Sequence, residues 1–420
     1  MIGADPGDTV PRPRGAWCCV QSGHRERYGI PRALFKAGLL DTLITDLWAP
    51  PGSPLWAMAG GRAGRRMRDR YHPDLPAGKV TAFSWRTVAW EAAASLRGLG
   101  GNARVKARNA WWPNLAAEAL RRVASPATGF VFAYCYEARE VFRQARRSGL
   151  TPVLGQIDPG PAEDRKVAAI VGRWPKYRTP FKPGLEEYYA AWREECRLAG
   201  HIVVNSEWSR TALAEEGIDA RRITVCPLVY TPPPGALGWV RSYPEAFTRE
   251  RPLRVLFLGQ CILRKGIAET IGAAQALADM PVEFTFVGNT DIEDFEGHFG
   301  RARIRYVPRV SREECDAHYR GADVFLIPTH SDGFGLTQLE AQAWKLPIIA
   351  SRFCGEVAEP GVTGWVLDDV SVESIAGLLR RILAEPAELA RRSSAIGPWR
   401  FNLEGLGHRL RVLTPAPASG

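Results

Sequence analysis

Short apolar runs alternate with amphipathic stretches along most of the chain. Gly, Pro or polar residues bound these runs, a pattern typical of strands buried on both faces of a parallel sheet. Helices are expected between them, for example over Pro31–Ala37 and Ala138–Arg147, the latter followed by Gly149 as a C-terminal cap. The strands predicted in the first half are Trp17–Val20, Thr42–Leu47, Phe130–Tyr134, Val153–Ile157, Ile202–Asn205 and Ile223–Pro227.

Residues 231–252 interrupt the alternation with a series of prolines and glycines, which indicates a linker. The alternation then resumes, with helices expected over about 267–277 and about 336–344 and a helical tail anchored by Trp399 and Phe401. The strands predicted here are Arg254–Leu258, Glu283–Val287, Ile304–Val307, Val324–Ile327, Ile348–Ala350 and Trp365–Leu367. We therefore expect two doubly wound α/β domains that face a central cleft lined by strand carboxyl ends. The predicted domains are 1–235, 236–395, and a C-terminal helix and tail, 396–420, that returns to the first domain.

Length and composition support two real hydrophobic cores. The chain has 420 residues, 45% hydrophobic and 24% charged, which excludes a disordered chain, a coiled coil and a collagen-like rod. No run reaches the roughly 18 to 20 apolar residues of a membrane-spanning helix, and the first residues lack the apolar core of a secretory signal. These features predict a cytoplasmic protein.

The eight cysteines and seven histidines are scattered, with no CxxC and no HExxH. Zinc sites and disulfide frameworks use tight, paired spacings. We therefore predict no metal site.

The net charge of +10 is unevenly distributed. Residues 60–110 contain eleven basic residues against three acidic ones, a local excess of 11 − 3 = +8, and five tryptophans lie in or beside this stretch. Such a segment could rest on the anionic inner face of a membrane, bind nucleic acid, or form a solvated face over buried tryptophans. No nucleic-acid-binding motif is present, so we exclude that partner. The five tryptophans are Trp56, Trp85, Trp90, Trp111 and Trp112, and the basic residues are Arg62, Arg65, Arg66, Arg68, Arg70, Lys79, Arg86, Arg97, Arg104, Lys106 and Arg108.

The strongest chemical signal is the segment SDGFGLTQLEAQAWKLPIIAS, residues 331–351. A strand runs into a glycine-bearing turn and then a helix predicted to start near Phe334 or Gly335. Glycines allow close approach of a ligand, and amides at a helix start favour phosphate. Asp332 before the turn and Glu340 inside the helix would suit sugar hydroxyls. An ordinary strand–turn–helix is the alternative.

A second signal is VLFLGQCILRKGI, residues 255–267. Gly259 ends a strand, and Arg264 and Lys265 precede a helix. Two such cations can hold a diphosphate and stabilise it as a leaving group without a metal. The alternative is a pair of surface basic residues.

Together these segments resemble the retaining GT-B glycosyltransferases related to sucrose synthases and bacterial mannosyltransferases, known as glycosyltransferase family 4 or glycosyl transferases group 1. GQCILRKGI is similar to the family's diphosphate segment and SDGFGLTQLE to its E-x7-E motif. FTFVG, YVPRVSREECDAHYRGADVFLIPT and GEVAEPGVTGWVLDD follow in the family's order and spacing. In the first half, residues 22–34 resemble the glycine loop and first helix of the acceptor domain, and 203–218 its late strand and helix. The resemblance implies an N-terminal acceptor domain and a C-terminal nucleotide-sugar domain, both Rossmann-like.

The resemblance also implies residue roles. Lys265, with Arg264 beside it, would hold the donor pyrophosphate, and Glu340 would bind the ribose. Asp332 and Asp158 would contact the donor sugar. The other implied donor-binding positions are Gly259, Gln260, Gly288, Asn289, Pro308, Arg309, Gly333, Phe334, Gly335, Leu336 and Thr337.

The sequence departs from the family pattern at three positions and in one short segment. Asp332 stands where the family usually has Glu, and Gln260 where it often has Arg. Asp158 takes the place of an acceptor-side His, although an acid that opens an Asp-Pro-Gly turn is the alternative there. The family's His-x-His-Glu reads Tyr134-Cys135-Tyr136-Glu137.

The predicted activity is transfer of a sugar from a nucleoside-diphosphate sugar to an acceptor hydroxyl, with retained anomeric configuration and no cofactor, in the synthesis of a glycan, polysaccharide or glycolipid. Arg264 and Lys265 would stabilise the departing diphosphate, whose oxygen would accept the acceptor's proton. Two alternatives remain. One is a nucleotide-sugar epimerase or hydrolase on the same scaffold. The other is a non-catalytic partner of a membrane glycan-synthesis complex.

Overall fold

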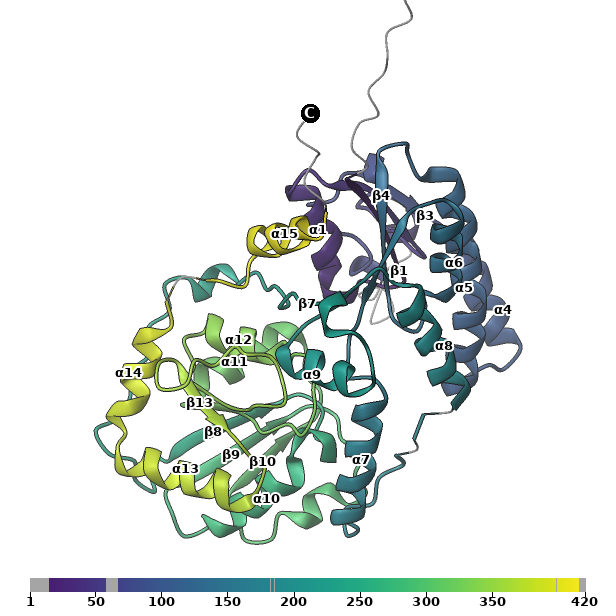
Figure 1. The fold of residues 1–420 in the computed structure, drawn as a ribbon. Helices are drawn as coiled ribbons and strands as arrows, with labels where there is room; N and C mark the ends of the chain where they lie inside the picture. Colours follow the sequence, from purple (N-terminus) through teal and green to yellow (C-terminus); the bar gives the residue numbers. More distant parts are fainter. Residues whose placement is uncertain (1–14, 58–66, 182, 185, 398, 415–420) are drawn as a thin grey trace, which may run out of the picture. The chain divides into compact units, whose positions relative to one another are not determined.

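The computed structural model of the protein divides into two compact units, each built on a parallel sheet (Figure 1). The first unit comprises Met1–Gly155, Ala190–Ile202 and Leu403–Gly420, and the second Gln156–Tyr189 and Val203–Asn402. The structure describes residues 15–57, 67–181, 183–184, 186–397 and 399–414.

A seven-stranded sheet has the order β3-β2-β1-β4-β5-β6-β7. Its strands are β1 (Ala16–Gln21), β2 (Leu40–Thr45), β3 (Val80–Ala82), β4 (Thr128–Tyr134), β5 (Thr151–Gly155), β6 (His201–Val204) and β7 (Ile223–Val225). All were predicted except β3, and the predictions ran two residues past the ends of β2, β5 and β7. The β-branched and aromatic residues of β1 and β4 are buried on both faces, as a central parallel pair requires.

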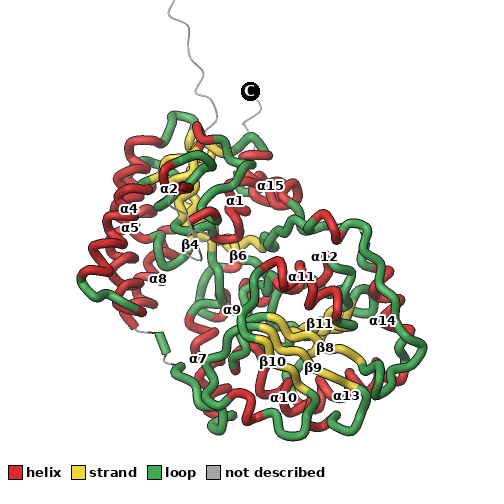
Figure 2. The backbone as a smooth tube through the Cα atoms, turned by 180° about the vertical axis from the view of Figure 1, so that it is seen from behind, coloured by secondary structure: helices red, strands yellow, loops and turns green. Residues whose placement is uncertain are grey.

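Helices cover both faces of this sheet in the first unit. In Figures 1 and 2, α1 and α15 lie on one side and α4 and α5 on the other, where Figure 1 also shows α6. Gly407 of α15 allows close packing on α1, because a Cβ there would come within 3.0 Å of the Ala33 carbonyl oxygen. The helices are α1 (Gly29–Lys36), α2 (Pro54–Ala57), α4 (Ser84–Leu96), α5 (Gly101–Val123), α6 (Arg139–Arg147), α8 (Glu186–Leu198) and α15 (Leu403–Val412).

The second unit contains a six-stranded sheet of order β10-β9-β8-β11-β12-β13, with every recorded pair parallel. Its strands are β8 (Leu253–Leu258), β9 (Val282–Val287), β10 (Ile304–Val307), β11 (Val324–Ile327), β12 (Ile348–Ser351) and β13 (Gly364–Leu367). All six were predicted. Two hydrophobic clusters fill the space between this sheet and its helices.

Figures 1 and 2 show α10 and α13 on one side of this sheet and α11 and α12 on the other. The helices of the second unit are α7 (Pro161–Arg173), α9 (Glu207–Glu215), α10 (Ile267–Ala276), α11 (Arg312–Gly321), α12 (Thr337–Ala343), α13 (Val372–Ala384) and α14 (Ala387–Ala395). The predicted anchor Phe401 is buried and lies against Phe334.

Residues 231–252 do not form the free linker that their composition indicates. The guanidinium of Arg241 donates to the carbonyl oxygens of Trp344, at 2.8 Å, and Ala322, at 2.5 Å. It also donates to Tyr319. Carbonyl groups at the end of a helix lack partners within the helix. The Arg241 guanidinium donates hydrogen bonds to such groups near the end of α11. The segment therefore packs onto the second unit.

Candidate active site in the second unit

The order of the six strands reverses between β8 and β11, and the loops that follow these two strands meet there. Gly266, with φ of +73°, lets them touch, because a Cβ at this residue would lie 2.0 Å from the Pro328 carbonyl oxygen. Open parallel sheets bind ligands at such a switch point, outside the carboxyl ends of their strands. The two segments singled out in the sequence are these two loops.

Arg264 and Lys265 lie in a single 3-10 turn after β8 and contact the loop after β11. Arg264 Nη1 donates to the Ser331 carbonyl oxygen at 2.7 Å, and Lys265 Nζ forms an ion pair with Asp332 Oδ2. Burial acts to raise the pKa of Asp332, but Lys265 and Arg264 outweigh it and hold the pKa below its usual value. The structure thus brings three predicted site residues together in one half-enclosed cluster.

The glycine turn that follows is tightly packed. A Cβ at Gly333 would come 2.1 Å from the Ile157 carbonyl oxygen, and Gly335 has φ of +83°. The side chain of Phe334 is 2% exposed, and its amide donates to Asp332 Oδ1 at 3.4 Å. The helix does not start at Phe334 or Gly335 as predicted. α12 begins at Thr337, because the left-handed conformation of Gly335 cannot belong to a right-handed helix.

Asp158 lies beside this turn. Its Cα would be 3.5 Å from a Cβ at Gly333. Its Oδ1 accepts from the Gly160 amide at 2.8 Å and from Gln156 Nε2 at 3.2 Å, the geometry of an acid that opens a turn. The hydrogen bonds of Asp158 are therefore those expected of an acid that opens a turn. The position of Asp158 next to Gly333 is also compatible with contact to a ligand.

Glu340 is hydrogen-bonded to a residue of a neighbouring helix. It sits on α12, and its Oε2 accepts from the buried Tyr319 hydroxyl of α11 at 2.8 Å. Burial raises the pKa of Tyr319 well above its usual value, and the Glu340 carboxylate adds to this effect. The hydrogen bond of Glu340 to Tyr319 therefore joins α12 to α11.

The remaining predicted positions follow the neighbouring strands. The backbones of Gly259 and Gly288 touch at the ends of β8 and β9, because a Cβ at Gly288 would lie 1.8 Å from the Gly259 carbonyl oxygen. The Asn289 carbonyl accepts from the Cys261 amide at 2.8 Å. Three further positions are exposed in the loops after β8 and β10: Gln260, Pro308 and Arg309.

Sequence reasoning missed three residues of this cluster: Glu163, Trp208 and Ser331. Glu163, in the first turn of α7, has its Oε2 3.4 Å from Arg264 Nη1 and accepts from Ser331 Oγ at 2.9 Å. Trp208 Nε1 donates to the same hydroxyl at 3.2 Å. The only sequence signal for Glu163 was an acid in a helix's first turn, which is common at any helix start.

The first unit has its own cluster at strand carboxyl ends, in the loops after β1 and β2. Asp46 is fully buried, and its Oδ1 accepts from the Gly23 amide at 2.9 Å and from Arg70 at 2.8 Å. Arg108 of α5 pairs with the other oxygen. In the glycine loop that the resemblance predicted, three consecutive residues have left-handed φ between 51° and 60°: Glu26, Arg27 and Tyr28. Such strain in non-glycine residues persists only where the surrounding structure imposes it.

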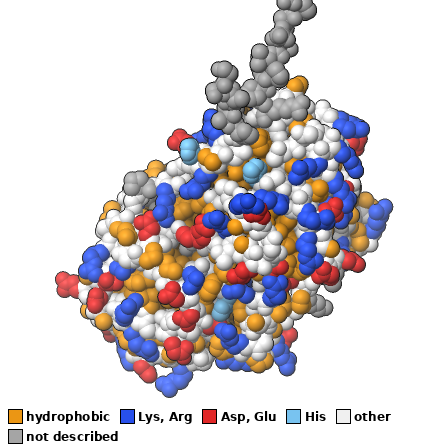
Figure 3. Space-filling view, in the orientation of Figure 1, with side chains coloured by type: hydrophobic (Ala, Val, Ile, Leu, Met, Phe, Trp, Pro, Cys, Tyr) orange, Lys and Arg blue, Asp and Glu red, His pale blue; other side chains and the backbone are white. Residues whose placement is uncertain are grey.

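The basic, Trp-rich stretch includes α4 and the first half of α5, and three of its arginines, Arg62, Arg65 and Arg66, lie outside the described residues. Part of its charge is neutralised internally, because Arg70 and Arg108 bind Asp46 and Arg104 pairs with Glu91. Figure 3 shows Lys and Arg side chains along the margin where α4–α6 lie, with acidic side chains among them.

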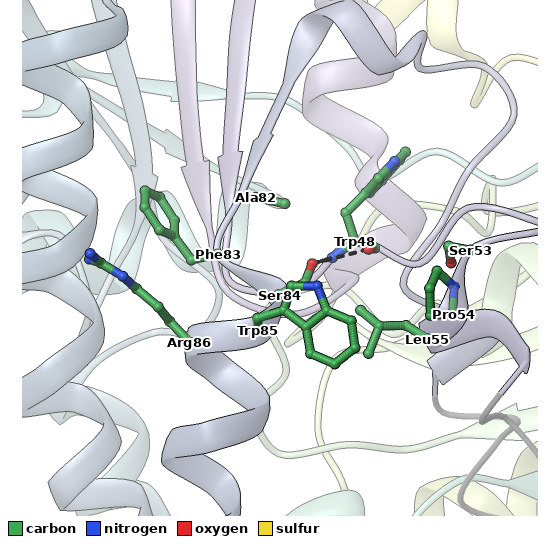
Figure 4. Close-up of a pocket in the computed structure, with 9 residues that line it drawn as sticks. All are labelled: Trp48, Ser53, Pro54, Leu55, Ala82, Phe83, Ser84, Trp85 and Arg86. Carbon is green, nitrogen blue, oxygen red and sulfur yellow. Dashed lines mark hydrogen bonds between the residues drawn. The ribbon is translucent and has the colours of Figure 1, made fainter.

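The tryptophans of this stretch differ in exposure. Trp112 is buried, Trp90 stacks on Trp111, and Trp85 is 59% exposed. Trp85 lines a hollow of about 450 Å³, in which its indole lies next to Leu55 while Arg86 extends to the other side (Figure 4).

Among the described residues, no three His, Cys, Asp or Glu side chains gather as a metal ion would require. No helix in that same part of the chain has both the length and the apolar character to cross a bilayer.

Comparison with known proteins agrees with the resemblance seen in the sequence. Residues 243–397 match the model of the family "Glycosyl transferases group 1". D-inositol 3-phosphate glycosyltransferase from Kineococcus radiotolerans is 32% identical over 166 residues, which are 36% of this chain and 35% of that protein. The enzyme of the same name from Corynebacterium urealyticum is 27% identical over 250 residues, 52% of this chain and 58% of its own length. The chain therefore spans about a third to somewhat over half of these two relatives.

Solved structures match along nearly the whole chain. Anabaena HepE in complex with UDP and glucose has a TM-score of 0.59 at 13% identity, covering 95% of this chain and 98% of its own. A trehalose-6-phosphate protein from E. coli bound with UDP-2-fluoro glucose has a TM-score of 0.60 at 14% identity, covering 94% and 99%. Sucrose-phosphate synthase from Thermosynechococcus elongatus reaches 0.57 at 18% identity, covering 96% and 98%. These likenesses confirm the predicted GT-B fold of two Rossmann-like halves.

Proposed function

Because residues 243–397 belong to the glycosyl transferases group 1 family, we propose that the protein transfers a sugar from a nucleoside-diphosphate sugar to an acceptor hydroxyl with retained anomeric configuration. The observation that carries this proposal is the cluster of Arg264, Lys265 and Asp332 at the β8–β11 switch point. Two fixed cations beside an acid suit a ligand that has a diphosphate at one end and sugar hydroxyls at the other.

In this proposal, Arg264 and Lys265 take up the negative charge that develops on the diphosphate as the glycosidic bond breaks. Asp332 stays ionised beside them, since its pKa is held low, and accepts hydrogen bonds from donor-sugar hydroxyls. The close contact of Gly333 with the Ile157 backbone fixes the turn, so the amides there keep their positions during the reaction. The departing phosphate oxygen accepts the acceptor's proton.

UDP-sugars are the first donors to test, because HepE and the E. coli protein were crystallised with UDP-containing ligands. We expect UDP to raise the melting temperature, since a ligand that binds only the native state stabilises it. GDP and ADP serve as the comparison. Turnover that yields a glycosylated acceptor supports transfer, whereas free sugar or an epimer as the sole product contradicts it.

We further propose that α4 rests on an anionic lipid surface at which the acceptor is presented. Four apolar residues at helical spacing face the solvent on this helix: Trp85, Ala89, Ala92 and Leu96. Trp85 is 59% and Leu96 90% exposed, and Arg86 and Arg97 lie beside them. An apolar helix face flanked by arginines suits the boundary between headgroups and acyl chains.

Liposome flotation tests this second proposal. We expect binding to vesicles that contain anionic lipid and loss of binding in Trp85→Ser/Leu96→Ser. The control is Val412→Ser, which removes an exposed apolar side chain, 72% exposed, from α15. Equal flotation of both variants, or binding that ignores lipid charge, contradicts the proposal.

A further inference from the structure

Glu163 holds one of the two cations of the candidate donor site. Its side chain is 18% exposed, and its Oε2 both faces Arg264 Nη1, at 3.4 Å, and accepts from Ser331 Oγ, at 2.9 Å. The same Arg264 nitrogen donates to the Ser331 carbonyl oxygen. In this arrangement, Arg264 Nη1 is shared between the Glu163 carboxylate and the Ser331 carbonyl oxygen.

The cluster contains more acids than bases. Three carboxylates, of Glu163, Asp158 and Asp332, stand against the two cations of Arg264 and Lys265, a formal balance of −3 + 2 = −1 when all are ionised. A diphosphate entering such a site meets cations already paired with carboxylates, and it adds further negative charge. Taking up one proton would remove the excess and release a cation.

Glu163 is poised to accept that proton. Burial raises its pKa to about 7; Asp158 and Asp332 add to the rise, while Arg264 and the Ser331 hydroxyl oppose it. Asp332 differs, because Lys265 and Arg264 hold its pKa low. The other polar groups around Glu163 are Trp208, which bonds Ser331, and the phenol of Tyr189, whose pKa the Glu163 charge helps to raise.

We propose that Glu163 is a positioning residue that restrains Arg264 in the empty site and releases it to the donor diphosphate when Glu163 takes up a proton from solvent. This inference rests on the proposed function, because it assumes that a diphosphate binds at Arg264 and Lys265. A protonated Glu163 keeps its hydrogen bond to Ser331, since a neutral carboxyl both donates and accepts. Binding of a nucleoside diphosphate is therefore coupled to proton uptake at one carboxyl group.

The coupling predicts how affinity depends on pH. Above about pH 7, where Glu163 is ionised in the empty site, UDP affinity falls by up to tenfold per pH unit, the slope expected for uptake of one proton. Glu163→Gln mimics the protonated form, so this variant binds UDP as tightly as the wild type at pH 6 and more tightly than the wild type at pH 8.5. The phosphate of UDP itself ionises near pH 6 and affects both proteins equally.

Isothermal titration calorimetry with UDP, at pH 6 to 8.5 and in two buffers of different ionisation enthalpy, measures the affinity and the protons taken up. We expect uptake of close to one proton by the wild type at pH 8 and close to none by Glu163→Gln. The matched control is Glu216→Gln, which removes a glutamate of the same unit that pairs only with the exposed Arg165 in the recorded ion pairs, and it should behave like the wild type.

The outcomes separate the two proposals. A wild type that binds UDP with the same slope and the same proton uptake as Glu163→Gln overturns the role of Glu163 and leaves the donor site intact. A wild type that binds none of UDP, GDP and ADP at any pH overturns the proposed function itself. Cooperative unfolding of Glu163→Gln, followed by circular dichroism, establishes that its binding data describe a folded protein.

Discussion

Two glutamates, one buried in the first unit and one of low exposure in the second, have similar acidity but different surroundings. Burial raises the pKa of both Glu195, on α8 in the first unit, and Glu163, on α7 in the second, to about 7. Glu195 accepts from three backbone amides, those of Tyr136 at 2.7 Å, Ala138 at 2.9 Å and Arg139 at 3.1 Å. Glu163 instead faces two side chains, Arg264 and Ser331.

The difference shows that a raised pKa does not by itself indicate a functional residue. The amides around Glu195 belong to the loop between β4 and α6 and to the first residue of α6, so this carboxylate fixes the backbone there. A guanidinium such as that of Arg264 can turn to another anion. Only the partners of the second glutamate allow it to respond to a ligand.

The largest expected effect is on the first unit. Glu195→Ala removes the acceptor of three backbone amides, one buried and two part-buried, and at roughly 1–3 kcal/mol for an unsatisfied buried group the free energy of unfolding should fall by about 2–3 kcal/mol. Urea denaturation measures this change. The control is Glu194→Ala on the same helix, which breaks only the ion pair with Arg143 and should cost at most about 1 kcal/mol. Equal losses in the two variants would show that the hydrogen bonds donated by these amides add no more stability than the ion pair of Glu194.

In the second unit, we expect the next largest effect, and it is on enzymatic activity and not on stability. Lys265→Ala removes a cation from the proposed diphosphate site, and loss of one such stabilising group typically lowers turnover by about 10²–10³-fold. Because Asp332 keeps Arg264 and the Phe334 amide as neighbours, we expect cooperative unfolding to be retained. The control for the turnover and unfolding measurements is Lys176→Ala, at an exposed lysine of the same unit. Turnover near the wild-type rate would remove Lys265 from the site.

A smaller effect concerns the pH dependence of stability. The native state binds more protons than the unfolded chain between about pH 4.5 and 7, because the pKa of each glutamate rises from 4.5 to about 7 on folding. The free energy of unfolding should therefore fall as the pH rises through this window. Chemical denaturation at several pH values should show a shallower decline in Glu195→Gln and in Glu163→Gln.

Ligand binding then distinguishes the two variants. Only Glu163→Gln should alter the pH dependence of UDP binding, because only Glu163 lies beside the proposed diphosphate site. A change of the same size in Glu195→Gln would mean that the two glutamates do not differ in the way their partners indicate.

Most strands could be predicted because each is a continuous apolar run. β3 was not predicted, because it has only three residues and all are half-buried. No hydrophobic pattern marks an edge strand of this length. The start of α12 was misplaced for a local reason: Gly335 adopts a left-handed conformation, which composition allows but does not require. Arg264, Lys265 and Asp332 could be predicted as one site because parallel strands bring the loops after β8 and β11 to the same edge.

The amino-acid sequence by itself determined the two doubly wound halves and the glycine, arginine and lysine chemistry of the second, because periodicity and local motifs need no knowledge of distant contacts. Only the tertiary structure decided which acids stand beside the cations and which are bound elsewhere. Glu163 reaches Arg264 across 101 positions of sequence, while Glu340 is bound to Tyr319 on a neighbouring helix. Such pairings depend on how the helices pack on the sheet. Each pKa is set by burial and by nearby charges, and both are determined only once that packing is complete.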